Sequence, residues 1–186
     1  MRKAFFLDRD GVVNVEVDYL HRPEDVILVP GASQALRMIH AAGYLAIVVS
    51  NQSGVARGMY GMDEVKAVEN RICELLRQQD GEIPDACYYC PHHQKGVVPE
   101  WSFDCECRKP KPGLILKAVS DWKIDPAQSF MIGDRMSDLH AAEAAGCRDG
   151  ALVLTGYGEH EAEHARAEGW AVEDSILEAV KYLLKK

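Results

Sequence analysis

The sequence lacks any long hydrophobic segment. Its longest apolar runs, such as residues 44–49, are far shorter than the roughly 20 residues that a membrane-spanning helix needs. The apolar stretch from Ala4 to Leu7 is also too short for the core of a signal peptide, and no small-residue cleavage site follows it. We therefore expect a cytoplasmic protein with no membrane partner.

An excess of basic residues is also missing. The chain has 21 Lys and Arg residues against 29 Asp and Glu residues, which gives a formal net charge of −8. A nucleic-acid-binding protein usually presents a basic surface, so nucleic acid is not an expected partner. A small site on an acidic protein can still be locally positive, and phosphorylated small molecules remain suitable ligands.

No internal repeat, low-complexity tract or Pro/Gly-rich linker divides the chain. Its 186 residues are 47% hydrophobic and 27% charged, close to the average for soluble globular proteins. A chain of this length can bury most of its apolar surface in one core. We expect a single domain over residues 1–186, in the form of a monomer.

Short apolar runs alternate with segments of helical periodicity. Four runs are continuous enough for strands that are buried on both faces: Ala4–Leu7, Leu45–Val49, Phe130–Ile132 and Ala151–Leu154. Helices are predicted over residues 65–76 and 176–184, and from Ala32 to Ala42 with Gly43 as the C-terminal stop. This alternation indicates an α/β fold, with a parallel sheet covered by helices on both faces.

Polar clusters follow three of these predicted strands. They are Asp8-Arg9-Asp10-Gly11, Ser50-Asn51-Gln52-Ser53-Gly54 and Gly133-Asp134. In a parallel sheet of this class, ligands bind beyond the carboxyl ends of the strands. The three clusters are therefore expected to meet at one edge of the sheet.

The carboxylates of these clusters suit phosphoryl transfer. Asp8, Asp10 and Asp134 offer the oxygen ligands that Mg²⁺ prefers, and such an ion is often shared with a substrate phosphate. One Asp can then attack phosphorus while the next gives a proton to the leaving oxygen. Asp-Gly is also a common turn sequence, but the agreement of three clusters favours a site.

Ser50 and Lys109 can hold the phosphoryl group itself. A hydroxyl and backbone N–H groups at a strand-to-helix turn form a natural phosphate cradle, although a lone Ser-Asn pair is more often a helix cap. A lysine beside the carboxylates would neutralise phosphoryl oxygens, and Lys109 is confined between a cysteine pair and two prolines.

Residues 88–112 are rich in Cys, His and Pro and show neither a helical nor a strand pattern of apolar residues. Three thiolates and one imidazole make the usual closed set of a structural zinc site, and four residues of this segment provide it: Cys90, His92, Cys105 and Cys107. His93 is an alternative to His92. No ligand position is left for water, so this zinc would serve stability and not catalysis. The remaining cysteines are expected to be free thiols.

Together these motifs resemble the haloacid dehalogenase (HAD) phosphatases. The matching segments are Phe6 to Val12, Ser50, Lys109 and Gly133 to Asp138, in the order typical of that superfamily. The resemblance implies a Rossmann-like core, Asp8 as nucleophile and Asp10 as general acid and base. It also implies that Ser50 and Lys109 hold the phosphoryl group. Mg²⁺ would bind the Asp8 carboxylate, the Asp10 backbone carbonyl and Asp134, with Asp138 in support.

A narrower resemblance covers nearly the whole chain. Residues 50–58, 88–93 and 105–110 are similar to the heptose-1,7-bisphosphate 7-phosphatases. That family hydrolyses the C7 phosphate of a small phosphorylated sugar, on the route to activated heptose for bacterial surface glycans. The resemblance implies substrate contacts from Glu16, Val17, Asp18, Tyr19, Ser50, Asn51, Gln52, Ser53, Arg108 and Lys109. Arg108 would meet the second phosphate, since a guanidinium fork suits that role. Val12 departs from the pattern, because close members often have threonine there.

Three other functions compete with this one. Histidinol-phosphate phosphatase is a similar small enzyme with a zinc loop, but Arg108 would repel the amine of its substrate. An inactive, zinc-stapled binding module would be expected to have lost at least one motif residue. A sugar-phosphate mutase needs closure around its intermediate, and the spacing of the motifs leaves no room for a cap domain. We therefore expect an open site covered only by loops.

Overall fold

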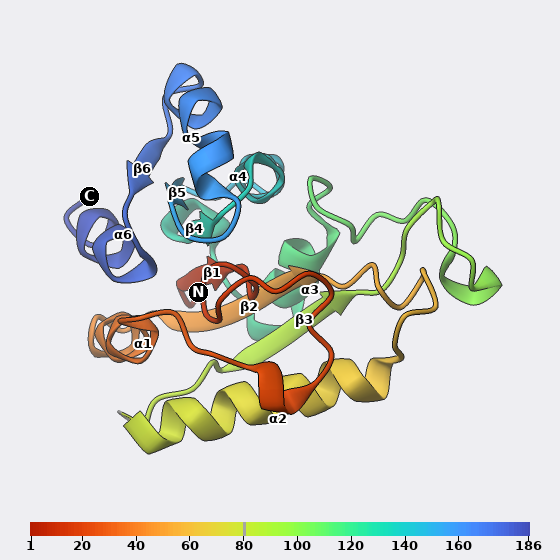
Figure 1. The fold of residues 1–186 in the computed structure, drawn as a ribbon. Helices are drawn as coiled ribbons and strands as arrows, with labels where there is room; N and C mark the ends of the chain where they lie inside the picture. The colour runs from red at the N-terminus through yellow and green to blue at the C-terminus, as the bar shows by residue number, and fades with distance from the viewer. Residues whose placement is uncertain (80) are drawn as a thin grey trace.

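The computed structural model describes residues 1–79 and 81–186, and within them one sheet of six parallel strands forms the centre of the fold (Figure 1). The strands lie in the order β3-β2-β1-β4-β5-β6, and each pairs in parallel with its neighbours. Their bounds are β1 (Ala4–Leu7), β2 (Leu45–Asn51), β3 (Ala86–Cys90), β4 (Phe130–Gly133), β5 (Asp149–Val153) and β6 (Ala171–Glu173).

Helices cover both faces of this sheet, as the alternating pattern predicts. The α-helices in the described residues are α1 (Ala32–Ala41), α2 (Met62–Gln79), α3 (Gly113–Trp122), α4 (Met136–Ala144), α5 (Gly158–Ala167) and α6 (Ile176–Leu183). Three short 3-10 helices join them: η1 (Pro23–Asp25), η2 (Pro99–Trp101) and η3 (Pro126–Gln128). One apolar cluster packs α1, α2 and α6 against the sheet, and a second packs α3 and α4 against the other face.

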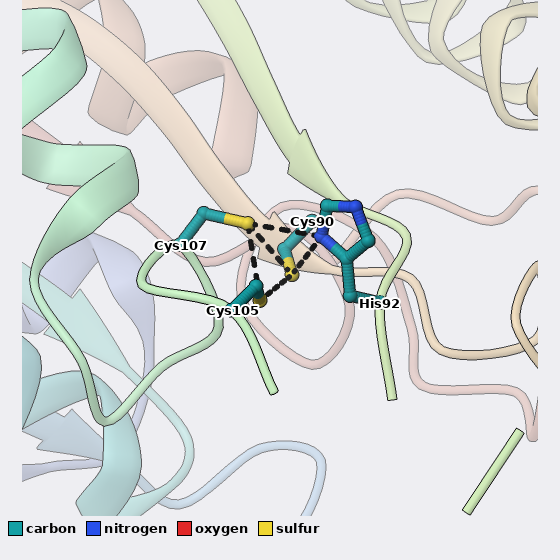
Figure 2. Close-up of side chains that lie close together, drawn as sticks. All are labelled: Cys90, His92, Cys105 and Cys107. Atoms are coloured by element: carbon teal, nitrogen blue, oxygen red, sulfur yellow. Dashed lines mark hydrogen bonds between the residues drawn. The ribbon is translucent and has the colours of Figure 1, made fainter. Parts of the chain in front are cut away.

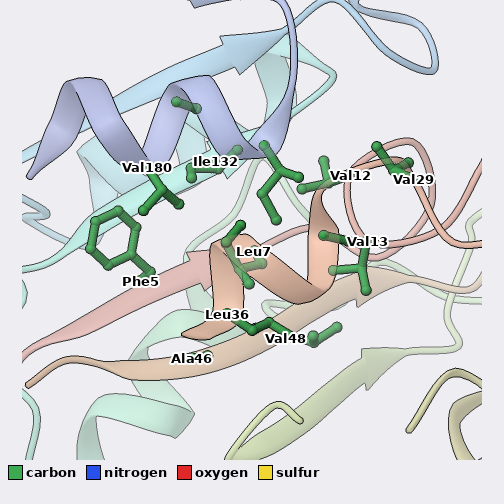
Figure 3. Packing of buried hydrophobic residues seen from close by; sticks show 14 of the residues in the cluster. Phe5, Leu7, Val12, Val13, Val29, Leu36, Ala46, Val48, Ile132 and Val180 are labelled. Atoms are coloured by element: carbon green, nitrogen blue, oxygen red, sulfur yellow. The ribbon is translucent and has the colours of Figure 1, made fainter. Parts of the chain in front are cut away.

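Alternate strand residues supply the two cores. Phe5, Leu7 and Val48 point to the α1 and α6 side, where Figure 3 shows them with Ile132 and Val180. The intervening residues of the same strands belong to the second cluster. Because successive side chains of a strand point to opposite faces, continuous apolar runs are what a sheet covered on both sides requires.

The predicted elements are largely confirmed, with differences at the sheet edges. β1 has the predicted bounds, β2 and β4 extend further, and β5 runs from Asp149 to Val153 instead of from Ala151 to Leu154. β3 and β6 were not predicted. β3 begins inside a Cys- and Tyr-rich stretch, and four of its five residues are only half-buried. The first residues of the expected loop 88–112 are therefore the end of a strand.

No cap domain is present in residues 1–79 and 81–186. Only η1 and α1 lie between β1 and β2, and α2 is the helix between β2 and β3. None of the helices in this part of the chain is long and apolar enough to cross a bilayer. The loops at the carboxyl end of the sheet are thus the cover of any site there (Figure 1).

Candidate active site

A cavity of about 510 Å³ opens beyond the carboxyl ends of β1, β2 and β4. It is lined by the carboxylates that follow β1 and by loops that lie far from them along the chain. Its lining residues are Asp8, Asp10, Glu16, Val17, Asp18, Tyr19, Leu20, Ser50, Asn51, Gln52, Ser53, Arg57, Tyr60, Arg108, Lys109, Pro110, Arg135, Ser137, Asp138 and Tyr157. All the predicted catalytic and substrate-contacting residues are therefore brought to one place.

Three buried carboxylates form a cluster at this cavity, of which Asp8 and Asp138 line it and Asp134 lies beside them. One oxygen each of Asp8, Asp134 and Asp138 lies within 4.8 Å of the others. Burial raises the pKa of Asp8 to about 6 despite the opposing effect of Lys109. Burial also raises the pKa of Asp134 to about 8, and the neighbouring Asp8 and Asp138 carboxylates add to this shift. Such a cluster needs more positive charge than the protein supplies.

The donor set fits Mg²⁺. Oδ1 of Asp134 is buried and has no hydrogen-bond partner among the described residues, so an oxygen is free for a cation. Hard oxygen ligands around a small space are what Mg²⁺ requires. The carboxylate of Asp10 does not belong to this cluster. Its assigned contact with the ion through the backbone carbonyl stays a prediction.

Gly11 allows the turn that brings the Asp8–Gly11 segment close to Asp134. Its φ of +80° lies in the left-handed region, which other residues rarely adopt. A Cβ at this position would also lie 2.3 Å from Oδ2 of Asp134, closer than any real contact. The Asp-Gly sequence is thus a turn, as the simpler interpretation has it, and that turn serves the carboxylate cluster.

Lys109 is the cation of the cluster. Its Nζ lies 2.9 Å from Oδ1 of Asp8 and 2.6 Å from Oδ1 of Asp138, and it donates to the carbonyl oxygen of Val49 at 2.7 Å. Burial alone would lower the pKa of this ammonium, but Asp138 and Asp8 together raise it above its usual value. Lys109 therefore stays charged beside Asp8.

Asn51 fixes the backbone of Lys109. Its Oδ1 accepts from the Lys109 N–H and its Nδ2 donates to the Lys109 carbonyl oxygen, both at 3.1 Å. Asn51 was predicted to contact substrate. It does line the cavity, but its amide already makes these two bonds to the main chain.

Asp10 turns its carboxylate toward a ring of donors. Arg9 contacts it through Nε and Nη2, Asn14 donates at 2.9 Å, and Gln52 donates at 2.9 Å. Arg9 is only 1% exposed, although arginine is rarely buried. The sequence gives a reason to single out Asp10, and two of its partners, Arg9 and Asn14, are close to it along the chain, whereas Gln52 comes from just after the end of β2.

The loop after β1 provides one wall of the cavity. Glu16, Val17, Asp18 and Tyr19, which the resemblance predicts to contact substrate, all line it. Burial raises the pKa of Glu16 to about 7, with a further contribution from Asp10 and Asp8. The φ of Tyr19 is +55°, an uncommon conformation for a residue with a side chain.

Arginine side chains bring positive charge to the cavity. Arg108 and Arg57 line the cavity, and Arg108 donates to the carbonyl oxygen of His92 at 3.3 Å. Burial lowers the pKa of Arg108, and the nearby Arg57 and Arg135 act in the same direction. Three guanidinium groups are therefore close enough to influence one another around an otherwise acidic site.

Several lining residues were missed by sequence reasoning. Tyr60 and Tyr157 are among them, whereas Arg57, Arg135 and Ser137 lie within the matching motifs but had no role predicted. Arg135 lies over the ring of Tyr157 at 3.5 Å, and the Tyr157 hydroxyl donates to Asp18 at 2.9 Å. Tyr157 stands in a loop after β5 with no motif around it, so no sequence signal could have identified it.

The predicted zinc ligands meet at the end of β3 (Figure 2). The Sγ of Cys107 lies 3.1 Å from that of Cys90, 3.4 Å from that of Cys105 and 3.2 Å from Nδ1 of His92. These four residues form a group that can hold a metal ion. Three sulfurs and one imidazole nitrogen so close together suit tetrahedral zinc.

His93 does not belong to this group. Its Nε2 lies 3.2 Å from a guanidinium nitrogen of Arg57, and its Nδ1 accepts from the backbone N–H of Lys95 at 3.0 Å. Of the two candidate histidines, the geometry favours His92. The cluster is also continuous with the cavity, because Cys107 directly precedes Arg108 and Lys109.

Comparison with known proteins agrees with this geometry. A family profile described as HAD-hydrolase-like matches residues 106–179. The chain is 39% identical to a D-glycero-beta-D-manno-heptose-1,7-bisphosphate 7-phosphatase of Haemophilus influenzae, over 97% of this chain and 94% of that protein. It is 41% identical to a D-glycero-D-manno-heptose-1,7-bisphosphate 7-phosphatase of Thermosynechococcus vestitus, over 98% and 95%.

A solved structure is similar over nearly the full length. It is that of a D,D-heptose 1,7-bisphosphate phosphatase from B. bronchiseptica in complex with magnesium and phosphate. The TM-score is 0.86 and the sequences are 33% identical, with 98% of each chain covered.

Proposed function

Because the chain belongs to the heptose-1,7-bisphosphate 7-phosphatase family of HAD-like hydrolases, we propose that it removes the C7 phosphate from D-glycero-D-manno-heptose 1,7-bisphosphate. Heptose 1-phosphate and inorganic phosphate are the products. The observation that carries the proposal is the juxtaposition of Asp8 and Lys109, 2.9 Å apart, with the Asp134 carboxylate in the same cluster as Asp8. One chain supplies every residue used, so a monomer suffices.

The reaction proceeds in two half-reactions, and Asp8 and Asp10 take part in both. A carboxylate oxygen of Asp8 attacks phosphorus, the bond from phosphorus to O7 breaks, and Asp10 gives its proton to O7. Water then attacks phosphorus, Asp10 takes a proton from that water, and Asp8 is released with phosphate. Lys109 and the Ser50 hydroxyl hold the phosphoryl oxygens while charge develops on them.

Asp8, Asp134 and the backbone carbonyl of Asp10 would hold Mg²⁺, with Asp138 in support. When bound, the ion supplies positive charge that offsets the three carboxylates and the phosphate. Asp138 already contacts Lys109 at 2.6 Å, so its contribution is to orient that ammonium. Cys90, His92, Cys105 and Cys107 would hold a structural zinc ion, away from the reacting phosphate.

Arg108 and Arg57 would receive the phosphate that does not react. A guanidinium pairs with phosphate through two parallel hydrogen bonds, which a cationic amine cannot accept. The two arginines therefore favour a bisphosphate over histidinol phosphate. Glu16 and Asp18, which line the same cavity, have the acceptors that sugar hydroxyls need.

The test is phosphate release in the presence of Mg²⁺, measured with heptose 1,7-bisphosphate and with histidinol phosphate. We expect a higher kcat/KM for the bisphosphate, and we expect Arg108→Met to raise its KM by about tenfold or more, because a charged hydrogen-bonded pair is worth about 1.5–3 kcal/mol. A preference for histidinol phosphate would overturn the substrate, and no release from either ester would overturn the phosphatase itself.

A further inference from the structure

Gln52 occupies a position where all its hydrogen-bonding capacity is used by the protein. Its Nε2 donates to Oδ2 of Asp10 at 2.9 Å and to the Ser50 hydroxyl oxygen at 3.1 Å. Its Oε1 accepts from the Tyr60 hydroxyl at 3.0 Å and from Nη2 of Arg9 at 3.3 Å. A side-chain amide offers two donors and two acceptor sites, so none is left for a ligand.

The surroundings also fix which way this amide points. Nε2 faces an Asp10 oxygen that only accepts, and Oε1 faces the Arg9 guanidinium, which only donates. A flipped amide would lose both contacts. Gln52 is 2% exposed, and Tyr60 stacks on the ring of His21 with centroids 5.4 Å apart. The amide is therefore held rigidly between two loops.

We propose that Gln52 is a positioning residue for the proton transfers of Asp10, and not a contact for the sugar. This inference rests on the phosphatase function proposed above. The Asp10 carboxylate accepts five hydrogen bonds, which are donated by Arg9, Asn14 and Gln52. Arg9 and Asn14 are the donors to Oδ1, whereas Oδ2 is held by Arg9 and Gln52 alone.

The orientation of the Asp10 carboxylate matters for the reaction. In each turnover, one of its oxygens must lie within hydrogen-bond reach of the leaving oxygen. Without Gln52, Oδ2 keeps one donor and the carboxylate can rotate out of line. The rate would then fall for esters whose leaving group needs a proton from Asp10. It would change little for esters whose leaving group departs without a proton.

Simple phosphate esters test this without the sugar. Phenols such as tyrosine ionise near pH 10, nitrophenol is far more acidic, and an alcohol such as benzyl alcohol needs full protonation as it leaves. The parameter is kcat/KM, which reports the steps up to departure of the leaving group and not the later hydrolysis of the phosphorylated Asp8.

For Gln52→Met we expect kcat/KM to fall by about tenfold or more with benzyl phosphate, and by less than about twofold with p-nitrophenyl phosphate. Asp10→Asn should show the same leaving-group dependence in stronger form. Tyr60→Phe, which removes one partner of Oε1 and keeps the ring, should show it in weaker form. This last variant decides the matter if Gln52→Met does not fold.

Equal losses on both esters would overturn the proposal, because Gln52 would then serve the nucleophile or the fold. Unchanged values on both esters, together with a raised KM for heptose 1,7-bisphosphate, would also overturn it and make Gln52 a sugar contact. Wild-type protein that hydrolyses none of these esters would instead count against the phosphatase function itself.

Discussion

At the scale of single residues, the site concentrates buried charge to an unusual degree. Asp8, Arg9, Lys109, Asp134 and Asp138 are all less than 9% exposed, although such residues are rarely buried without partners. Each of these groups has an opposite charge or a hydrogen-bond partner beside it, although Oδ1 of Asp134 and Nη1 of Arg9 make no hydrogen bond within the described residues. The stability lost in burying these groups is offset when the metal and the phosphate complete the set.

Replacing the nucleophile separates activity from stability. We expect Asp8→Asn to lower kcat by at least about 10³-fold, since loss of a covalent nucleophile removes the step on which the others depend. The metal-free variant should unfold at no lower temperature than the metal-free wild type, because one of three mutually repelling carboxylates is gone. Phosphate release and a thermal melt measure the two effects, and near-normal turnover would exclude covalent catalysis by Asp8.

What the sequence reveals at this scale is the acidic and cationic centre. Asp8, Ser50 and Asp134 are readable because each directly follows a continuous apolar run or its closing glycine, and parallel topology brings the ends of these runs together. The roles of Asn51 and Gln52 are not readable, because an amide bonds to whatever donor or acceptor the fold brings near it. Their neighbours lie up to 58 residues away along the chain.

At the scale of elements, the segment after β3 connects the Cys/His cluster to the carboxylate cluster. Cys107, Arg108 and Lys109 are consecutive, so a ligand of the cluster, a lining arginine and the cation beside Asp8 share one short stretch of backbone. A displacement of the cluster must move the other two. A metal that takes no part in the reaction can therefore still be required for it.

Breaking the cluster tests this coupling. We expect Cys107→Ser to lose bound zinc and to lower kcat/KM by about 10²-fold, since a shift of about 1 Å in a positioned group can cost that much. Cys73→Ser is the matched control, because Cys73 belongs neither to the cluster nor to the cavity lining. Metal analysis and kinetics together decide, and full activity in zinc-free Cys107→Ser would contradict the coupling.

The central strands and the cluster ligands could be predicted, whereas the edge strands could not. β1, β2 and β4 are buried on both faces and so read as continuous apolar runs. β3 and β6 lie at the two edges of the sheet, where half-buried positions accept polar and aromatic residues. Their pairing is decided by the tertiary structure and leaves little trace in the local sequence.

At the scale of the whole molecule, an acidic protein must bind acidic substrates. The chain has a net charge of −8, yet its cavity is lined by Arg57, Arg108, Lys109 and Arg135 as well as by carboxylates. Cations and carboxylates are interleaved in this lining, because Lys109 contacts Asp8 and Asp138, and Arg135 lies over Tyr157, which bonds to Asp18. One cavity can therefore offer opposite charge both to a phosphate and to a cation.

The raised pKa values of Asp8 and Asp134, about 6 and about 8, predict a pH-dependent affinity for Mg²⁺. Both groups must lose their protons to bind the ion, so the affinity should rise by more than about tenfold between pH 5.5 and 8.5. Calorimetric titration of the metal-free protein, in buffers of different ionisation enthalpy, measures the affinity and the protons released. An affinity that does not change with pH would contradict these shifts.

The raised pKa of Asp134 also makes the stability of the metal-free protein depend on pH. Folding raises the Asp134 pKa above its ordinary value of 3.8, so the folded protein binds that proton more tightly than the unfolded chain does. The resulting stabilisation is complete below about pH 4 and is lost as the pH rises through about 8. Metal-free wild type should therefore lose stability, relative to Asp134→Asn, between pH 5 and pH 8.5. A constant difference between their melting temperatures would contradict this.

Which ester the protein cleaves is decided by the identity of the product. Each anomer of heptose 1,7-bisphosphate is incubated with the protein and Mg²⁺ and followed by phosphorus NMR, with Asp8→Asn as the blank. For at least one anomer, the C7 phosphate signal should disappear and inorganic phosphate should appear while the C1 phosphate remains. Loss of the C1 phosphate first, or no change with either anomer, would show that this protein is not a 7-phosphatase.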